Sequence, residues 1–76
     1  MKELLTYIAK NLVNDPDAVS VTETQQGDET VFELRVAPDD MGKVIGRHGR
    51  IAKEIRTLMK AAGNRQNKKV SVEIVD

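Results

Sequence analysis

The feature that most constrains this fold is a four-residue segment, Gly46-Arg47-His48-Gly49, placed directly before an amphipathic stretch. Its two glycines bracket two side chains that can contact a phosphate. Glycine allows a positive φ angle and a close approach of the backbone to a ligand. The free N–H groups and the dipole at a helix N-terminus favour a bound negative charge. The segment therefore predicts a loop at which the backbone contacts a phosphate.

Hydrophobic residues on both sides of this loop recur with periods that predict six elements. Helices are expected over residues 2–13, from an N-cap at Asp39 or Asp40 through Ile45, and over 50–62, with strands over 18–24, 30–37 and 70–74. Residues 25–29 should form a hairpin loop, and Gly63-Asn64 is typical of a helix C-cap. The apolar stripe of the 50–62 helix consists of Ile51, Ile55, Leu58, Met59 and Ala62. For Met41, Met59 and Tyr7 we expect a packing role only.

The resulting order, α-β-β-α-α-β, predicts an α+β fold of two layers, in which three helices cover one face of a three-stranded mixed sheet. Strands 18–24 and 30–37 should pair as an antiparallel hairpin. Strand 70–74 should lie parallel to strand 30–37, because a helical crossover of sufficient length joins them. A chain of 76 residues without repeats or linkers is expected to form one domain over residues 1–76.

The charges of the chain separate along its length although the formal net charge is zero. Residues 1–42 hold three basic and nine acidic side chains, and residues 43–76 hold nine basic and three acidic ones. The two parts therefore carry formal charges of −6 and +6, and the boundary lies just before the glycine loop. A chain of zero net charge can thus present a strongly positive surface to a polyanion.

The residue types needed for catalysis or metal binding are scarce. His48 is the only histidine, there is no cysteine, and no acid–base pair lies near the loop. The P-loop pattern needs four residues between its glycines, whereas two separate Gly46 from Gly49. The adjacent carboxylates at 28–29 and 39–40 lack the spacing of a metal site. We therefore expect no enzyme, no metal and no cofactor.

The chain also lacks the sequence signals of export or membrane insertion. Its N-terminus has no long apolar run of the signal-peptide kind, and no stretch approaches the ~20 apolar residues that span a bilayer. The absence of cysteine fits a reducing compartment. These observations favour a cytoplasmic location and no membrane partner.

The elements around the loop resemble the KH domain family and its I-G-x-x-G signature. Val44-Ile45 precedes the loop, and a helix and a strand follow it. The additional helix and strand on the N-terminal side resemble the type II, bacterial arrangement. Residues 37–56 are also similar to those of small stand-alone bacterial KH proteins, and the resemblance covers the whole chain.

This resemblance implies single-stranded RNA binding, with about four nucleotides in a groove and the glycine loop on their backbone. It also implies a role as an RNA chaperone or post-transcriptional regulator. Arg47 would contact a phosphate, His48 would donate a hydrogen bond, and an aliphatic wall of Val44, Ile45 and Ile51 would pack against bases. The candidate RNA-binding residues are Lys43, Val44, Ile45, Gly46, Arg47, His48, Gly49, Arg50, Ile51 and Lys53.

Several alternatives remain open at this point. The KH fold could serve mainly as a dimerisation or protein-interaction module, as a homodimer or with a Jag-type KH-containing partner. Single-stranded DNA is a third ligand class, since phosphate contacts do not distinguish the sugars. Lys53, Arg56 and Lys60 could form an ordinary solvated helix face. Lys68 and Lys69 could protect an edge strand or contact RNA.

Overall fold

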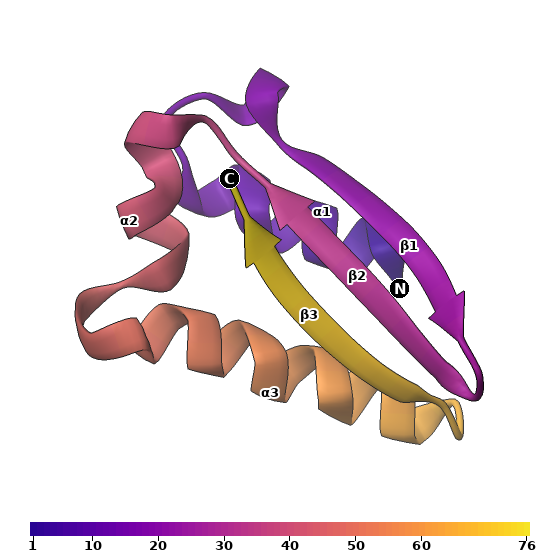
Figure 1. Cartoon of the computed structure of the whole chain (residues 1–76). Helices are drawn as coiled ribbons and strands as arrows, with labels where there is room; N and C mark the ends of the chain where they lie inside the picture. Colours follow the sequence, from indigo (N-terminus) through magenta and orange to yellow (C-terminus); the bar gives the residue numbers. More distant parts are fainter.

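The computed structural model describes all 76 residues and confirms the predicted order of helices and strands (Figure 1). The helices are α1 (Lys2–Leu12), α2 (Met41–Ile45) and α3 (Arg50–Arg65), and the strands are β1 (Ser20–Gln26), β2 (Glu29–Arg35) and β3 (Lys69–Val75). Single 3₁₀ turns at Pro16–Ala18, Pro38–Asp40 and Arg47–Gly49 connect some of them. Pro16 lies in the first of these turns, and α1 ends before it.

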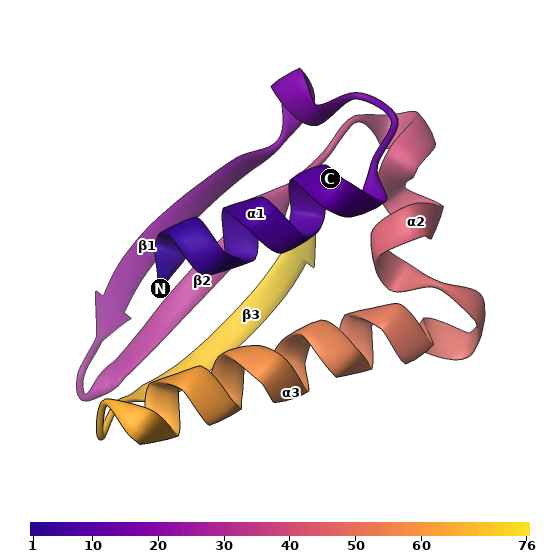
Figure 2. The ribbon, with the colours of Figure 1, turned by 180° about the vertical axis from the view of Figure 1, so that it is seen from behind.

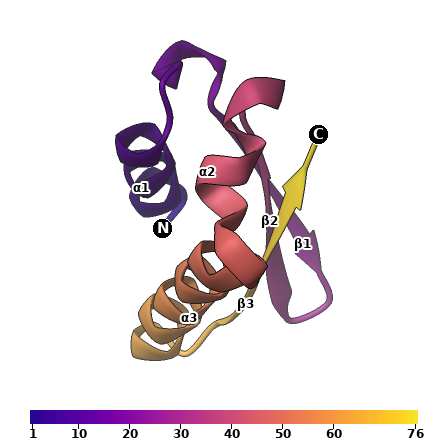
Figure 3. The same cartoon turned by 90° about the vertical axis from the view of Figure 1, so that its left-hand side faces the viewer.

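The strands form one mixed sheet in the order β1-β2-β3, as predicted. β1 pairs with β2 antiparallel, and β2 pairs with β3 parallel. The helices lie on one side of this sheet, with α1 and α3 across its face and α2 at one end (Figures 2 and 3). β1 and β3 are therefore the two edge strands, and α3 runs beside β3.

The hydrophobic core lies between the sheet and the helices. Phe32 and Leu34 of β2, and Val36 directly after its end, are buried in this core, as their alternation predicted. The residues that join them in the core are Leu5, Ala9, Val21, Val44, Ile55, Met59, Val70 and Val72. The inward side of the sheet is thus closed by all three helices, which fixes the position of the connections between them.

All six strand boundaries differ from the prediction, each by one or two residues. β1 begins at Ser20 rather than at residue 18, because Pro16–Ala18 form a 3₁₀ turn before it. The ladder continues to the pair Gln26 and Glu29, so the hairpin turn contains only Gly27 and Asp28. Gly27 has a φ of +65°, which a tight turn requires and glycine adopts readily. A two-residue turn extends the pairing further than a five-residue loop would.

The C-cap prediction at Gly63-Asn64 is wrong, because α3 continues to Arg65. The left-handed residue after the helix is Asn67, with a φ of +56°, and the N–H of Lys68 donates to the carbonyl of Gly63 at 2.8 Å. Gly63 is instead required by close packing. A Cβ atom there would lie 2.7 Å from Cγ2 of Val70 and 2.9 Å from the carbonyl oxygen of Lys68. Its missing side chain lets α3 approach the start of β3.

Asp40 occupies the N-cap position of α2, but its side chain does not cap the helix. Instead, its carboxylate oxygen Oδ2 accepts a hydrogen bond of 3.0 Å from the backbone N–H of Asp15. Asp40 is only 2% exposed although its neighbour Asp39 is exposed. The predicted capping role is therefore replaced by a bond between segments 25 residues apart, which holds the connection after α1 against the start of α2.

Replacing Asp40 with alanine is expected to lower the free energy of unfolding by about 1–3 kcal/mol, because a part-buried hydrogen bond between two segments is lost. The matched variant Asp39→Ala removes an exposed carboxylate next to it and should change that free energy by at most about 0.5 kcal/mol. Urea denaturation followed by circular dichroism compares the two. Equal stabilities would contradict the structural role of Asp40.

The helices leave several hydrophobic side chains outside the core. Tyr7 is 69% exposed, so the packing role expected for it is wrong, whereas Met59 is fully buried and Met41 packs against the core. Leu58 on α3 is 54% exposed. Leu4 is 41% exposed and lines a shallow hollow with Leu58, where α1 passes α3.

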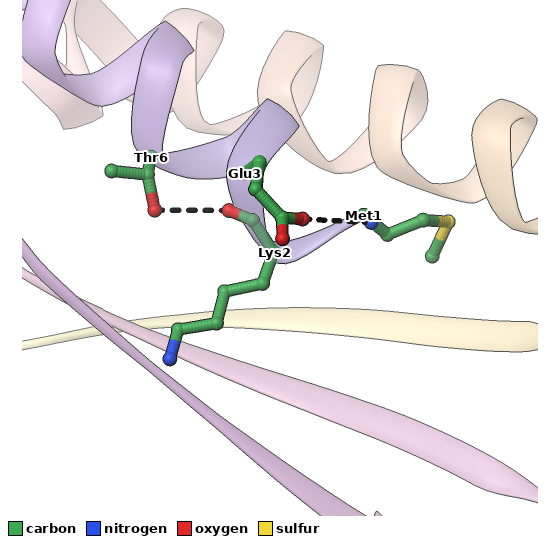
Figure 4. A network of polar contacts seen from close by, with 4 residues as sticks. All are labelled: Met1, Lys2, Glu3 and Thr6. Carbon is green, nitrogen blue, oxygen red and sulfur yellow. Dashed lines mark hydrogen bonds and ion pairs between the residues drawn. The ribbon is translucent and has the colours of Figure 1, made fainter.

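Local polar contacts organise the first turn of α1 (Figure 4). The hydroxyl of Thr6 donates to the carbonyl oxygen of Lys2 at 2.9 Å, and the N-terminal ammonium of Met1 lies 3.4 Å from Oε2 of Glu3. A hydrogen bond from its own backbone, together with that ammonium group, lowers the pKa of Glu3. These polar contacts are exposed, although the side chain of Met1 itself packs against the core. None of the helices is long and apolar enough to cross a membrane.

Candidate functional site

The glycine loop connects α2 to α3 and has a defined shape. Gly46 has φ and ψ angles of 77° and 174°, a combination that is essentially restricted to glycine. His48 and Gly49 follow in the left-handed region, with φ angles of 58° and 72°. The N–H of Gly46 donates to the carbonyl of Gly42 at 2.9 Å, and the N–H of Gly49 donates to that of Gly46 at 3.2 Å. The loop is therefore an ordered turn that projects from the helices.

Gly46 also packs tightly against α3. A Cβ atom at this position would lie 2.6 Å from Cγ1 and 2.9 Å from Cβ of Ile51, closer than such contacts occur. A Cβ atom at Gly49 would meet nothing within 4 Å. The two glycines therefore serve different purposes: Gly46 is fixed by its conformation and by contact with Ile51, whereas Gly49 is required only by its φ angle.

The two side chains inside the loop point to solvent. Arg47 and His48 are exposed and make no hydrogen bond or ion pair with the rest of the chain. No side chain caps the N-terminus of α3, which begins at Arg50. The N–H groups of Gly49 and Arg50 already donate to the carbonyls of Gly46 and Arg47, while the helix dipole favours an anion at that position. The loop thus presents an unpaired cation and a hydrogen-bond donor beside an uncapped helix end.

The aliphatic candidates separate into buried and accessible residues. Val44 is fully buried in the core, so its expected place in the wall of an RNA groove is wrong. Ile45 is 37% exposed, and Ile51 is half-buried where it meets Gly46. Only Ile45 and Ile51 therefore offer apolar surface next to the loop.

The basic candidates lie on both sides of the loop. Lys43 is exposed on α2, and Arg50 and Lys53 are exposed on the first turns of α3. Arg50 and Lys53 also border an open depression of the α3 surface together with Glu54, Thr57 and Leu58. All the predicted site residues thus lie around the α2–α3 connection, and Val44 is the one among them that is fully buried.

A line of basic residues, which we call the α3 stripe, continues from the loop along the helix. Lys53, Arg56 and Lys60 follow Gly49 at spacings that place them on one face of α3. Nε of Arg56 donates a hydrogen bond of 3.2 Å to the carbonyl oxygen of Val72 on β3. This bond shows that the α3 stripe borders the edge of the sheet.

A hollow of ≈ 230 Å³ lies at the far end of this border, near the start of β3. Glu29, Lys60, Asn64, Lys69 and Val70 line it. Nζ of Lys69 is 3.2 Å from Oδ2 of Asp28. Lys69 is therefore paired with the hairpin turn, while Arg47 and Lys60 have no acidic partner.

Comparison with known proteins identifies the family. A family model described as KhpA/KhpB, KH domain, matches residues 2–74. The chain belongs to this family. The KhpA/KhpB assignment agrees with the element order and with the position of the glycine loop between α2 and α3.

Relatives of similar length support the assignment to the KhpA/KhpB family. A Clostridium acetobutylicum protein named RNA-binding protein KhpA is 57% identical over 75 residues, which cover 99% of this chain and 100% of the relative. The protein of the same name from Chlamydia trachomatis is 49% identical over 76 residues, covering 100% of this chain and 97% of the relative.

Solved structures of the protein Era show the same fold at low identity. A crystal structure of an Aquifex aeolicus Era variant bound to GDP.AlF4⁻ superimposes with a TM-score of 0.59 at 19% identity, covering 96% of this chain and 28% of that chain. Era in complex with MgGDPNP and nucleotides 1506–1542 of 16S ribosomal RNA gives a TM-score of 0.60 at 19% identity, with the same coverage of 96% and 28%. The KhpA/KhpB fold thus occurs there as part of a longer chain.

Arg56 was not among the site residues predicted from the sequence of this KhpA/KhpB chain. Its spacing from Gly49 and Lys53 could have indicated that Arg56 lies on the same helix face as these residues, because residues three and four apart share a helix face. The spacing alone did not show that β3 lies beside that face. The hydrogen bond to Val72 supplies this information.

Proposed function

We propose that this protein binds single-stranded RNA in the cytoplasm and acts as an RNA chaperone or post-transcriptional regulator. The observation that carries the proposal is the exposed, ordered loop Gly46-Arg47-His48-Gly49 at an uncapped helix end. Relatives matched over nearly their whole length are named RNA-binding proteins. The proposed site consists of this loop with Lys43, Ile45, Arg50, Ile51 and Lys53.

In this proposal the loop binds the sugar-phosphate backbone. Gly46 and Gly49 bring the main chain close to a phosphate, and the guanidinium of Arg47 donates charge-assisted hydrogen bonds to its oxygens. His48 donates a further hydrogen bond from its ring. Bases that follow this phosphate pack on Ile45 and Ile51. Phosphate contacts of this kind hold the strand in place without reading its sequence.

The distribution of aromatic residues favours weak binding with little sequence preference. Tyr7 and Phe32 are the only aromatic residues, Phe32 is buried in the core, and Tyr7 lies on α1. The loop therefore has no aromatic side chain on which bases could stack, in contrast to RRM or OB-fold domains. Higher affinity would come from a second copy or from a Jag-type KH partner on the same RNA.

The dependence of RNA affinity on salt tests the proposal. The logarithm of the affinity should fall linearly with the logarithm of the salt concentration, with a slope of about −2 if about three phosphates are neutralised. Fluorescence anisotropy with a labelled octamer of uridine between about 50 and 200 mM salt measures this slope. Absence of binding at low salt would contradict the proposed function.

A second candidate function is a dimerisation or docking module, favoured by the exposed Leu4, Tyr7 and Leu58 on α1 and α3. Analytical ultracentrifugation with and without the uridine octamer distinguishes the two. A module of this kind would assemble normally and leave the RNA free. An RNA-binding protein would instead move the RNA into the faster-sedimenting boundary, and the deoxyuridine octamer tests preference for the sugar.

A further inference from the structure

The outer edge of β1 is the sheet edge that no other element covers. β3, the opposite edge strand, is bordered by α3, whose Arg56 donates to the carbonyl oxygen of Val72. No α-helix or strand lies beyond β1 in the two views of the sheet (Figures 1 and 2). Six of its seven residues are exposed, and Val21 alone is buried. β1 therefore presents a free strand edge to solvent.

Three residues of this edge carry backbone groups without a partner in the chain. The pair Gln26 and Glu29 closes the two-residue turn, so alternate residues of β1, counted back from Gln26, exchange hydrogen bonds with β2. The N–H and C=O groups of the residues between them, Val21, Glu23 and Gln25, therefore point away from the sheet. No turn, loop or side-chain hydrogen bond of the chain uses these groups. They can pair with one further strand.

One carboxylate restricts which strand can pair here. The ladder runs from Ser20 to Gln26 without a bulge, a proline or a lysine, which are common devices that protect an edge strand. Glu23 lies opposite Phe32, a core residue, and so is on the helix side of the sheet. A charge on this side of an edge strand opposes pairing with an uncharged strand. A positive charge on the residue across from it removes this opposition.

The chain segment that contains β1 carries negative charge only. Residues 11–34 include six acidic side chains and no basic one. Asp15, Asp17 and Glu23 are exposed and form no ion pair, whereas Asp28 pairs with Lys69 of β3. Because opposite charges attract, this edge favours a basic segment and disfavours a phosphate backbone.

A second copy of the chain fits this edge poorly. The antiparallel register that pairs Val21, Glu23 and Gln25 at once places two copies of Glu23 directly opposite each other. Like charges at directly opposite positions destabilise a strand pair. Other antiparallel registers of two identical strands leave some of the outward groups unpaired. The edge thus favours a strand of different sequence.

We propose that the outer edge of β1 binds an extended basic peptide segment of another protein, which adds to the sheet as a fourth strand with Lys or Arg opposite Glu23. Main-chain hydrogen bonds to the three outward residues provide affinity, and the charge opposite Glu23 provides specificity. β2 separates β1 from β3, which the α3 stripe borders. The peptide and a bound RNA therefore occupy opposite edges of the molecule, and the proposal does not depend on the RNA-binding function.

Three blocked heptapeptides test the proposal: Lys-Val-Thr-X-Thr-Val-Lys in which X is Lys, Glu or N-methyl-Lys. In a heteronuclear NMR titration, the Lys peptide should shift the amide signals of Val21, Glu23 and Gln25 and slow their hydrogen exchange. The Glu peptide should bind about three- to tenfold more weakly, because like charges then lie opposite each other. The N-methyl peptide keeps the charge but lacks the central donor, so it should bind about fivefold or more weakly.

Two variants separate the charge at the edge from the charge of the whole chain. Glu23→Lys should reverse the preference, so that the Glu peptide binds more tightly than the Lys peptide. Thr22→Lys is the matched control, because it adds a positive charge on the other face of the sheet and should keep the preference for the Lys peptide. Circular dichroism and thermal unfolding establish that both variants are folded.

The proposal is overturned if the Lys peptide leaves the β1 amides unchanged, if all three peptides bind equally, or if the preference survives in Glu23→Lys. Shifts of the same amides with protein concentration alone would assign the edge to a second copy, and shifts caused by the uridine octamer would assign it to nucleic acid; either result also overturns it. Failure of that octamer to shift the amides of residues 46–49 would contradict the RNA-binding function and leave the peptide proposal intact.

Discussion

Replacing Gly46 with alanine is expected to lower the free energy of unfolding by about 2–6 kcal/mol. Its φ and ψ of 77° and 174° lie in a region that costs other residues about 1–3 kcal/mol. The added Cβ would also lie 2.6 Å from Cγ1 of Ile51, and overpacking of this kind costs a further ~1–3 kcal/mol. Urea denaturation followed by circular dichroism measures the loss.

Two other glycines provide controls for this prediction. Gly49→Ala introduces a Cβ into open space at a φ of 72°, so only the backbone penalty of about 1–2 kcal/mol applies. Gly42→Ala lies within α2 in open space and without a positive φ, so it should stabilise the protein by at most about 1 kcal/mol. If Gly46→Ala and Gly49→Ala are equally stable, the contact with Ile51 does not constrain the loop.

The double variant Arg47→Asp/His48→Asp is expected to reduce RNA affinity by at least about 100-fold, to the point where RNA is no longer retained. It removes the charged phosphate contact and places two carboxylates where the phosphate would bind. Both side chains are exposed and unpaired, so the circular dichroism spectrum and thermal unfolding should be unchanged. Anisotropy with the uridine octamer measures the affinity.

A charge-matched variant distinguishes a local effect from an overall one. Lys10→Asp/Asn14→Asp changes the net charge by the same amount at exposed positions on the N-terminal side of the chain. It should weaken RNA binding only slightly, because exposed charges beyond a Debye length are screened. If both double variants lose the same affinity, or if binding survives in Arg47→Asp/His48→Asp, the loop does not bind the backbone.

The sequence was sufficient to predict the element order, the mixed sheet and the position of the loop. These follow from local hydrophobic periods and from the rule that a helical crossover joins parallel strands. Asp40 and Gly63 were both interpreted as helix caps, because their residue types are typical of caps. Their actual contacts, with Asp15 and with Val70, depend on segments brought together only by folding.

Prediction of the candidate site from the sequence was limited in the same way. Arg47 and Gly46 could be assigned from the loop itself, since two glycines around two phosphate-binding side chains form a local motif. Val44 could not be placed, because helical periodicity does not decide which face of a five-residue helix is buried. The contact of Arg56 could not be predicted either, because it depends on the position of β3, whose Val72 lies 16 residues further along the chain.

The order of the glycine loop has a consequence for how long an RNA would remain bound. The N–H groups of Gly46 and Gly49 already donate to the carbonyls of Gly42 and Gly46, so little conformational freedom is left to lose when a ligand arrives. The electrostatic attraction of the basic surface speeds encounter. A small number of exposed contacts, however, gives a short residence time, because affinity differences are expressed mainly in dissociation rates. Such a protein would exchange rapidly between neighbouring sites and leave each strand free to refold.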